Sequence, residues 1–416
     1  MTCRDQTPTA DADYVKIRYI EEDSWGQDPG SGDMQELRFT AESLRKIRSM
    51  AVHDRISDAR QVKRISPTGF HTAGEINGRF SKGTYDDLIR GALGGTWDDT
   101  CVSSCSGCFA SVVDGNLRYA DSCRPAIDRL VGRVIRFDET FAADGNNRAV
   151  LVLGADDDHP DHYIVYPRLP ADEGEGQGGG NDAEGKYIEN DREQTSFYIE
   201  KEFIDLESGE DILSYSGMVV DQMSVNVRAA AVPTISFSFL GKRESIRSQP
   251  LLSGRIEKTA TDVMGPGARG KTYISWQSTD DSGDTVTSGL DGLAVRSVSL
   301  DVKNNLQVKN CVGVLNPTAI RSGRFSVTGS MSIYFQDFGL YRKFHELREN
   351  DPFSMMFTAG DLDSEDHGCY CFYAPATYMT TSKITAGGVN RDVMVDIGYQ
   401  AAVDGLHEKT LIISRV

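Results

Sequence analysis

The stretch with the most chemical potential is glycine-rich: residues 265–272 read Gly-Pro-Gly-Ala-Arg-Gly-Lys-Thr. It fits the pattern of a P-loop, whose backbone amides and lysine, here Lys271, would cradle nucleotide phosphates. That chemistry requires a buried strand before the loop and a helix after it. Residues 257–262 are too polar for such a strand, and residues 273–276 have the composition of a strand instead of a helix. A glycine-rich linker is the favoured interpretation.

Cysteines form the second candidate site. Cys101, Cys105 and Cys108 have the spacing of a three-thiolate iron–sulfur site, and Cys123 is close enough in sequence to be a fourth ligand. Radical enzymes with such clusters are βα barrels, and the chain shows no βαβα alternation. A structural zinc site or a disulfide remains open, against four free thiols. Elsewhere, Cys369 and Cys371 would share one face of a strand and serve as packing residues.

A third cluster, residues 156–162, reads Asp-Asp-Asp-His-Pro-Asp-His and could hold a divalent cation. Asp, Pro and His also gather in solvated turns between strands, which is the favoured interpretation. No arrangement of nucleophile, base and orienting acid for acyl transfer is visible in the sequence. We therefore expect no enzyme and no cofactor.

Composition limits the class of protein. A chain of 416 residues with 39% apolar content can bury two cores. Residues 1–14 are polar and no apolar run could cross a bilayer, so we expect neither a secretion signal nor a membrane span. Eight cysteines without a signal favour synthesis in a reducing cytosol. A net charge of −18 disfavours adhesion to DNA phosphates.

Alternation of apolar and polar residues predicts a mainly β protein. Two short helices are expected, one over residues 41–47 after Thr40 as N-cap and one over residues 85–93. Residues 171–185 are almost all Gly, Asp, Glu, Asn and Gln and predict a flexible loop. The expected strands include residues 15–20, 196–200, 223–227, 234–240 and 295–302, and a small meander formed by 131–135, 150–153 and 163–166.

An internal repeat is the most informative feature. Residues 74–80, Gly-Glu-Ile-Asn-Gly-Arg-Phe, resemble residues 329–335, Gly-Ser-Met-Ser-Ile-Tyr-Phe. Each is followed by a helix-like segment, at residues 83–88 and 339–344 respectively. A strand–turn–helix unit therefore occurs twice, which indicates tandem duplication of a domain, although two unrelated strands could share these residues by coincidence.

Several segments in a consistent order resemble the tail tube proteins of bacteriophages with long, non-contractile tails, the siphovirus type. The resemblance covers most of residues 15–245 and residues 293–334. It rests on residues 44–64, 74–76, 83–88, 92–97, 196–203, 215–220 and 237–242. A long insertion at residues 100–194 departs from the family pattern, and we expect it on the outside of the tube.

The resemblance implies tandem β-sandwich or half-barrel domains with short flanking helices, which add edge to edge into a ring with a continuous inner β-barrel. The expected domains are residues 1–250, with the β-meander insertion at 100–194, and residues 291–416, joined by a Gly-rich linker or extension at 251–290. Two domains per chain would make three chains a pseudo-sixfold ring, with six chains as the other possibility. The acidic surplus would keep DNA from sticking in the lumen, or it serves ordinary solubility.

The expected function is structural: stacked rings form the virion tail tube through which double-stranded DNA passes during ejection. Implied partners are further copies of the chain, the tape-measure protein, and tail terminator and tip proteins, with assembly in the host cytoplasm and no membrane. The loop and helix within residues 25–64 would contact the neighbouring ring. Two alternatives remain, a terminator or tip ring that does not polymerise and a nucleotide-dependent enzyme that uses Lys271.

Overall fold

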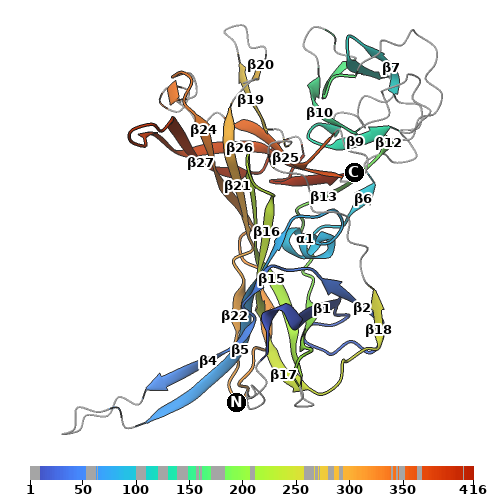
Figure 1. Ribbon diagram of the computed structural model, residues 1–416, viewed down its shortest axis with the longest axis vertical. Helices are drawn as coiled ribbons and strands as arrows, with labels where there is room; N and C mark the ends of the chain where they lie inside the picture. Colours follow the sequence, from blue (N-terminus) through green and yellow to red (C-terminus); the bar gives the residue numbers. More distant parts are fainter. Residues whose placement is uncertain are drawn as a thin grey trace, which may run out of the picture.

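Period-two alternation along the chain produces strands with one buried and one polar face, as the computed structural model shows (Figure 1). The structure describes residues 10–52, 62, 64–99, 109–119, 130–137, 149–155, 159, 162–169, 183–206, 211–256, 267, 270, 272–279, 285–289, 294–338, 341–342, 345, 352–362, 368–405 and 407–416. The protein is mainly β, with several sheets packed over shared cores. No described helix is long and apolar enough to span a membrane.

The elements follow one another along the chain, and in addition to α1 (Asp86–Leu93) the described residues Tyr341, Arg342 and His345 are α-helical. The first half contains η1 (Ala12–Tyr14), β1 (Val15–Glu21), β2 (Asp33–Leu37), β3 (Ala41–Glu42), β4 (Arg45–Val52), β5 (Ile65–Arg79), α1 (Asp86–Leu93), β6 (Asp98–Asp99), β7 (Phe109–Val113), β8 (Asn116–Tyr119), β9 (Val134–Phe137), β10 (Ala149–Ala155), β11 (His162–Tyr166), β12 (Ala183–Glu184), β13 (Lys186–Glu189) and β14 (Phe197–Phe203). The second half contains β15 (Ile212–Arg228), β16 (Thr234–Gly241), β17 (Arg243–Arg247), β18 (Gly254–Ile256), β19 (Thr272–Thr279), β20 (Thr285–Gly289), β21 (Val295–Lys303), β22 (Gln307–Lys309), β23 (Ala319–Arg321), β24 (Ser326–Tyr334), β25 (Phe353–Gly360), β26 (Cys369–Ala386), β27 (Val393–Ala402) and β28 (Ile412–Arg415).

The five strands and the second helix expected from the sequence are confirmed as β1, β14, β15, β16, β21 and α1. The helix expected over residues 41–47 is wrong, because these residues form β3 and the start of β4. Thr40 does not cap a helix; its hydroxyl donates to the backbone oxygen of Asn77 on β5, 3.1 Å away. One turn of helical periodicity was outweighed by the long β5 strand, which supplies backbone partners to both β3 and β4.

A central sheet runs through the whole molecule. Its hydrogen-bonded order is β4, β5, β16, β15, β21, β24, β27, β26, β25, β19 and β20, and each of these pairs is antiparallel. A second sheet branches from β15, whose first half pairs with β14; β1 and β2 continue from β14. The 17 residues of β15 therefore tie the two sheets together.

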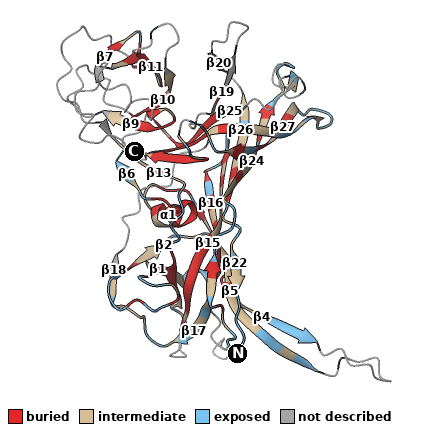
Figure 2. Cartoon of the chain, turned by 180° about the vertical axis from the view of Figure 1, so that it is seen from behind, coloured by how far each residue is buried: buried red, intermediate tan, exposed pale blue. Residues whose placement is uncertain are grey.

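The main core lies between the central sheet, the branch sheet and α1, as the red interior of Figure 2 shows. Phe237, Met223 and Val302 occupy neighbouring strands at matching register and are fully buried. On α1, Leu88 and Ile89 are also fully buried. The helix begins after Tyr85 and ends at Gly94, whose φ of 68° is the left-handed conformation that glycine adopts readily.

The insertion forms a separate sheet of six strands in the order β12, β9, β10, β11, β8, β7. Within it β9, β10 and β11 form the expected meander. It has its own small core, and a second cluster, including Val134 and Leu151, packs it against Cys369, Cys371 and Ile412 of β26 and β28. The segment expected to be a flexible loop lies outside the described residues from 171 to 182; residues 183 and 184 form β12.

Candidate assembly interface

One face of the central sheet is polar, because every second residue is a hydroxyl or amide. On β16, β15 and β24 this face carries mainly Ser, Thr, Asn and Gln, while the alternate residues are buried. Its charged residues are Glu75, Asp301 and Asp396 on β5, β21 and β27, and Arg45, Arg79, Arg228, Lys303 and Lys383 on β4, β5, β15, β21 and β26. The acidic surplus of the chain is therefore absent from this described face, which carries three acidic and five basic residues.

Neighbouring strands on this face also bond to one another through side chains. The hydroxyl of Ser224 donates to Asp301 at 2.5 Å, and the hydroxyls of Ser299 and Ser330 lie 2.8 Å apart. Ser332 donates to Asp396 at 2.7 Å. These cross-strand contacts fix the register of the sheet from its polar side, while packing fixes it from the other.

The strand pairings of the two halves of the chain follow one pattern. We call the strands β4, β5, β16, β15, β14, β1 and β2 the first unit, and β21, β24, β27, β26, β25, β19 and β20 the second unit; each set is given in hydrogen-bonded order. The residues of the sequence repeat occupy equivalent places: Gly74 pairs with Phe239, and Gly329 pairs with Tyr399. The division into domains at 1–250 and 291–416 stays a prediction, and the segment expected to be a linker holds β18, β19 and β20.

Irregularities of the pairing also coincide between the units. The β15–β16 register shifts between Val220 and Gln222, and the β26–β27 register shifts between Met379 and Thr381, each 159 residues further on. A second shift opposite Phe197 on β14 has its counterpart opposite Phe353 on β25. Bulges are specific, inherited features of a sheet, so their agreement is hard to attribute to two unrelated β segments.

The units are joined within the chain by β15 and β21. The second half of β15, from Gln222 to Arg228, pairs antiparallel with β21 from Lys303 to Ser297. The side chains at this junction are matched on both faces: Val225 and Leu300 are buried, and Ser224 bonds to Asp301. A unit of this fold therefore offers one strand edge that another unit can extend.

The two outer edges of this arrangement are open among the described residues. Strand β4 pairs with β5 alone, and all but one of its residues are exposed. The second half of β26, Met379 to Ala386, pairs with β27 on one side, whereas β25 and β28 pair only with the first half. Open edges of this length are templates for pairing with another strand.

The P-loop pattern lacks the context that nucleotide binding requires. Thr272 begins strand β19, as expected from the composition of residues 273–276. The amide of Gly267 donates to the Ala231 carbonyl and that of Gly270 to the Gly267 carbonyl, at 2.9 and 3.1 Å. Both amides therefore donate to backbone carbonyls of the chain. Lys271 and most of the upstream loop lie outside the described residues.

The cysteine cluster Cys101, Cys105, Cys108 and Cys123 lies outside the described residues, so zinc, disulfide and free thiols all remain open. Cys369 and Cys371 are fully buried between β26 and the insertion, which confirms their expected role in packing. Burial raises the pKa of the Cys369 thiol to about 12. This thiol is therefore protonated and unreactive at neutral pH.

The Asp–His cluster occupies the connection between β10 and β11, as a turn would. Only His159 and His162 of it are described; their rings meet edge to face at 5.2 Å. No group of three metal-binding side chains occurs in the described part of the chain.

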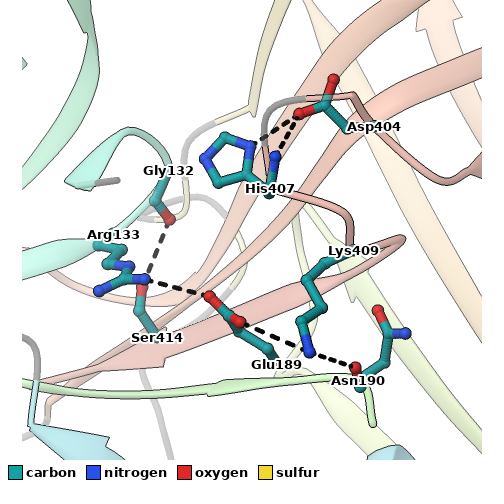
Figure 3. A network of polar contacts seen from close by, with 8 residues as sticks. All are labelled: Gly132, Arg133, Glu189, Asn190, Asp404, His407, Lys409 and Ser414. Carbon is teal, nitrogen blue, oxygen red and sulfur yellow. Dashed lines mark hydrogen bonds and ion pairs between the residues drawn. The ribbon is translucent and has the colours of Figure 1, made fainter. Parts of the chain in front are cut away.

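A polar network secures the insertion to the body of the protein (Figure 3). The guanidinium of Arg133 lies 3.2 Å from Glu189 and 3.4 Å from the centre of the Tyr187 ring. The amide of Val134 donates to the hydroxyl of Ser414 at 2.9 Å. Arg133 itself is nearly inaccessible to solvent, so this attachment is a buried one.

The comparison with protein families agrees with this architecture. The model of the phage tail tube protein family matches residues 15–401, nearly the whole chain. The chain belongs to this family. No curated protein matches the chain significantly. A phage tail tube protein is a structural component of the virion tail that assembles with itself and with other tail parts.

Proposed function

We propose that this tail tube protein polymerises as stacked rings into the tube of a siphovirus-type tail, which conducts double-stranded DNA during ejection. The observation that carries the proposal is the central sheet: it has two open edges, a polar face of mixed charge, and a second face covered by its core. Edge-to-edge addition of such sheets buries every open edge once the ring closes.

Three chains per ring, pseudo-sixfold, is the stoichiometry that two matching units per chain support. Each unit contributes four successive strands to the sheet between β4 and the second half of β26. A ring of three chains would close a barrel of roughly 24 strands, about 45–50 Å across between backbones at the usual strand spacing and tilt. The matching bulges support a tandem duplication as the origin of the two units.

The polar face suits a surface along which DNA moves. Its three carboxylates lie among its five basic residues, so it presents phosphates with only a small excess of the cations that would bind them by releasing counterions. Its hydroxyl and amide groups keep the surface hydrated. We propose that this face lines the lumen, and that the net charge of −18 arises on other surfaces. The insertion, attached to the far side through β26 and β28, would lie on the outside.

Stacking of rings would use the two arms that project from the sheet. The outer part of the β4–β5 hairpin exposes Met50, Val52 and Ile65, and Figure 2 shows it projecting away from the body. The connection between β22 and β23 exposes Val312 and other apolar residues, and joins the hairpin where the Phe70 amide donates to Leu315. Exposed apolar patches on such arms indicate protein contacts. Tape-measure, terminator and tip proteins would contact the same lumen and tube ends.

Negative-stain electron microscopy of the purified protein at high concentration tests the proposal. Hollow tubes with three- or sixfold end views are expected; chains that never assemble would refute it, and single rings that never stack would indicate a terminator or tip protein. Lys271→Ala separates the enzyme alternative. A tube protein with this substitution assembles unchanged, and neither it nor the parent protein binds a nucleotide. Nucleotide binding that the substitution abolishes would favour an enzyme.

A further inference from the structure

The internal junction of this chain contains the information needed to predict the junction between chains. At the internal junction, the second half of β15 in the first unit pairs with β21 in the second unit. The strand equivalent to β15 is β26, and the segment equivalent to β21 is the edge formed by β3 and the start of β4. Both of these have open edges in the described chain. A second copy that repeats the internal junction would therefore bring its β3–β4 edge to the free half of β26.

The matching registers define this contact residue by residue. The shared bulges relate Gln222–Val227 to Thr381–Ala386. The pairings with β5 and β24 relate Ala41–Ile47 to Ser297–Lys303, since Glu42 pairs with Ile76 as Val298 pairs with Met331. Because Asn226 pairs with Ser299 at the internal junction, the same geometry places Ser43 of one copy opposite Thr385 of another.

Side chains at the predicted contact suit this register on the buried face. Ile384 and Leu44 take the places that Val225 and Leu300 occupy at the internal junction. Leu44 is buried, and Ile384 packs against the main core while remaining partly accessible. The pairing would cover the remaining apolar surface of Ile384, as Leu300 covers Val225.

The polar face of the contact is also matched. The hydroxyl of Thr385 is shielded from solvent and has no hydrogen-bond partner in the described chain. The hydroxyl of Ser43, which lies on an exposed residue, would stand opposite it. Lys383 and Arg45 would meet between Asp396, the β27 partner of Lys383, and Glu75, on the strand next to Arg45. Lys383 and Arg45 are a like-charge pair, which is unfavourable across strands, and the two carboxylates beside them would offset the repulsion.

We propose that residues 41–47 of one chain, which comprise β3, Ser43, Leu44 and the start of β4, add antiparallel to the free half of β26 in a second copy of the chain, with Ser43 opposite Thr385 and Ile47 opposite Thr381. This pairing rests on the proposed function, because it specifies the edge contact by which rings would close. It also gives each chain one edge that is added and a different edge that accepts it, so the contact is head-to-tail. Every edge of the assembly is then paired only when the chains form a closed ring.

A disulfide scan tests the pairing. Ser43→Cys and Thr385→Cys are combined in one chain that also carries Cys311→Ser, which removes the native thiol that is exposed among the described residues. Directly opposed residues of antiparallel strands have Cα atoms about 4.5–5.5 Å apart, within disulfide reach. After assembly and mild oxidation, a non-reducing denaturing gel is expected to show dimers and a closed covalent trimer as the largest product. The Cys311→Ser parent measures cross-linking by the remaining native cysteines.

The matched control combines Ser43→Cys with Thr381→Cys, which the register separates by about 13 Å along the strand, beyond disulfide reach. It should form no ladder above the parent. The pair Ile47→Cys with Thr381→Cys is a second in-register test if the first variant fails to fold. Tubes or rings in the microscope without cross-links from either in-register pair, or with equal cross-links from the control, would refute the pairing and leave the proposed function standing. A parent protein that never assembles would refute both.

Discussion

The first prediction concerns Tyr370, which connects the two units in the interior. Its hydroxyl donates to Asp86 of α1 at 2.6 Å and accepts the Gly83 amide at 2.9 Å. Asp86 also pairs with Arg415 of β28 at 2.9 Å. Complete burial raises the pKa of Tyr370 well above its ordinary value, so the hydroxyl keeps its proton and remains a donor. We expect Tyr370→Phe to weaken the attachment of α1 to β26.

The expected cost is about 2–3 kcal/mol of unfolding free energy, because a buried hydrogen bond to a charged group contributes about 1.5–3 kcal/mol and its loss leaves Asp86 with less compensation. Equilibrium urea unfolding of the unassembled protein, followed by tryptophan fluorescence, measures it. Trp97 meets Tyr370 edge to face at 6.4 Å and should report the change locally.

Tyr334→Phe is the matched control, since Tyr334 is 37% exposed and its hydroxyl can exchange a protein partner for water. It should change the free energy of unfolding by less than about 0.5 kcal/mol. Equal midpoints for the two variants would refute the argument that the Tyr370 hydroxyl joins the units. Asp86→Asn, alone and combined with Tyr370→Phe, then measures the coupling between the two groups in a double-mutant cycle.

Three further predictions follow from local geometry. Gly91→Val should destabilise the fold by about 1–3 kcal/mol, because a Cβ at Gly91 would lie 2.7 Å from the Phe197 ring; an unchanged melting temperature would contradict this. Burial raises the pKa of Glu22, so its contribution to stability is present below about pH 4.5 and declines as pH rises through the folded-state pKa. As pH rises, the unfolding midpoint of wild type should accordingly fall relative to that of Glu22→Gln. Midpoints of the two proteins that keep a constant difference at all pH values would count against this. Arg133→Ala removes the ion pair with Glu189 and should make the insertion more sensitive to limited proteolysis while tubes still form; resistance equal to wild type would show that the apolar contacts suffice.

Strand content and the second helix could be predicted from the sequence because each follows from local alternation. Residues 234–240 alternate cleanly, and the structure buries Ile235, Phe237 and Phe239 on one face. The helix at residues 41–47 was wrong because Arg45 and Lys46 form helices readily, and only the distant β5 decides that they are strand.

The candidate interface was beyond local reasoning. Thr385 and Ser43 are ordinary strand residues in the sequence, and their importance appears only when the bulges at Asp221 and Thr380 align the two units. The repeat at residues 74–80 was the one signal that pointed there. The net charge of the whole chain was also a poor guide to the lumen, because a total does not say which face carries the acidic residues.

The internal junction between β15 and β21 has a consequence for how reliably such a tube could grow. If rings form as proposed, two units joined in one polypeptide would enter a ring only in pairs, so rings with five or seven units could not form and the diameter could vary only in large steps. Every second joint around the ring would also form within a chain, independent of protein concentration. A closed ring would thus contain half as many contacts between chains as a ring of separate units.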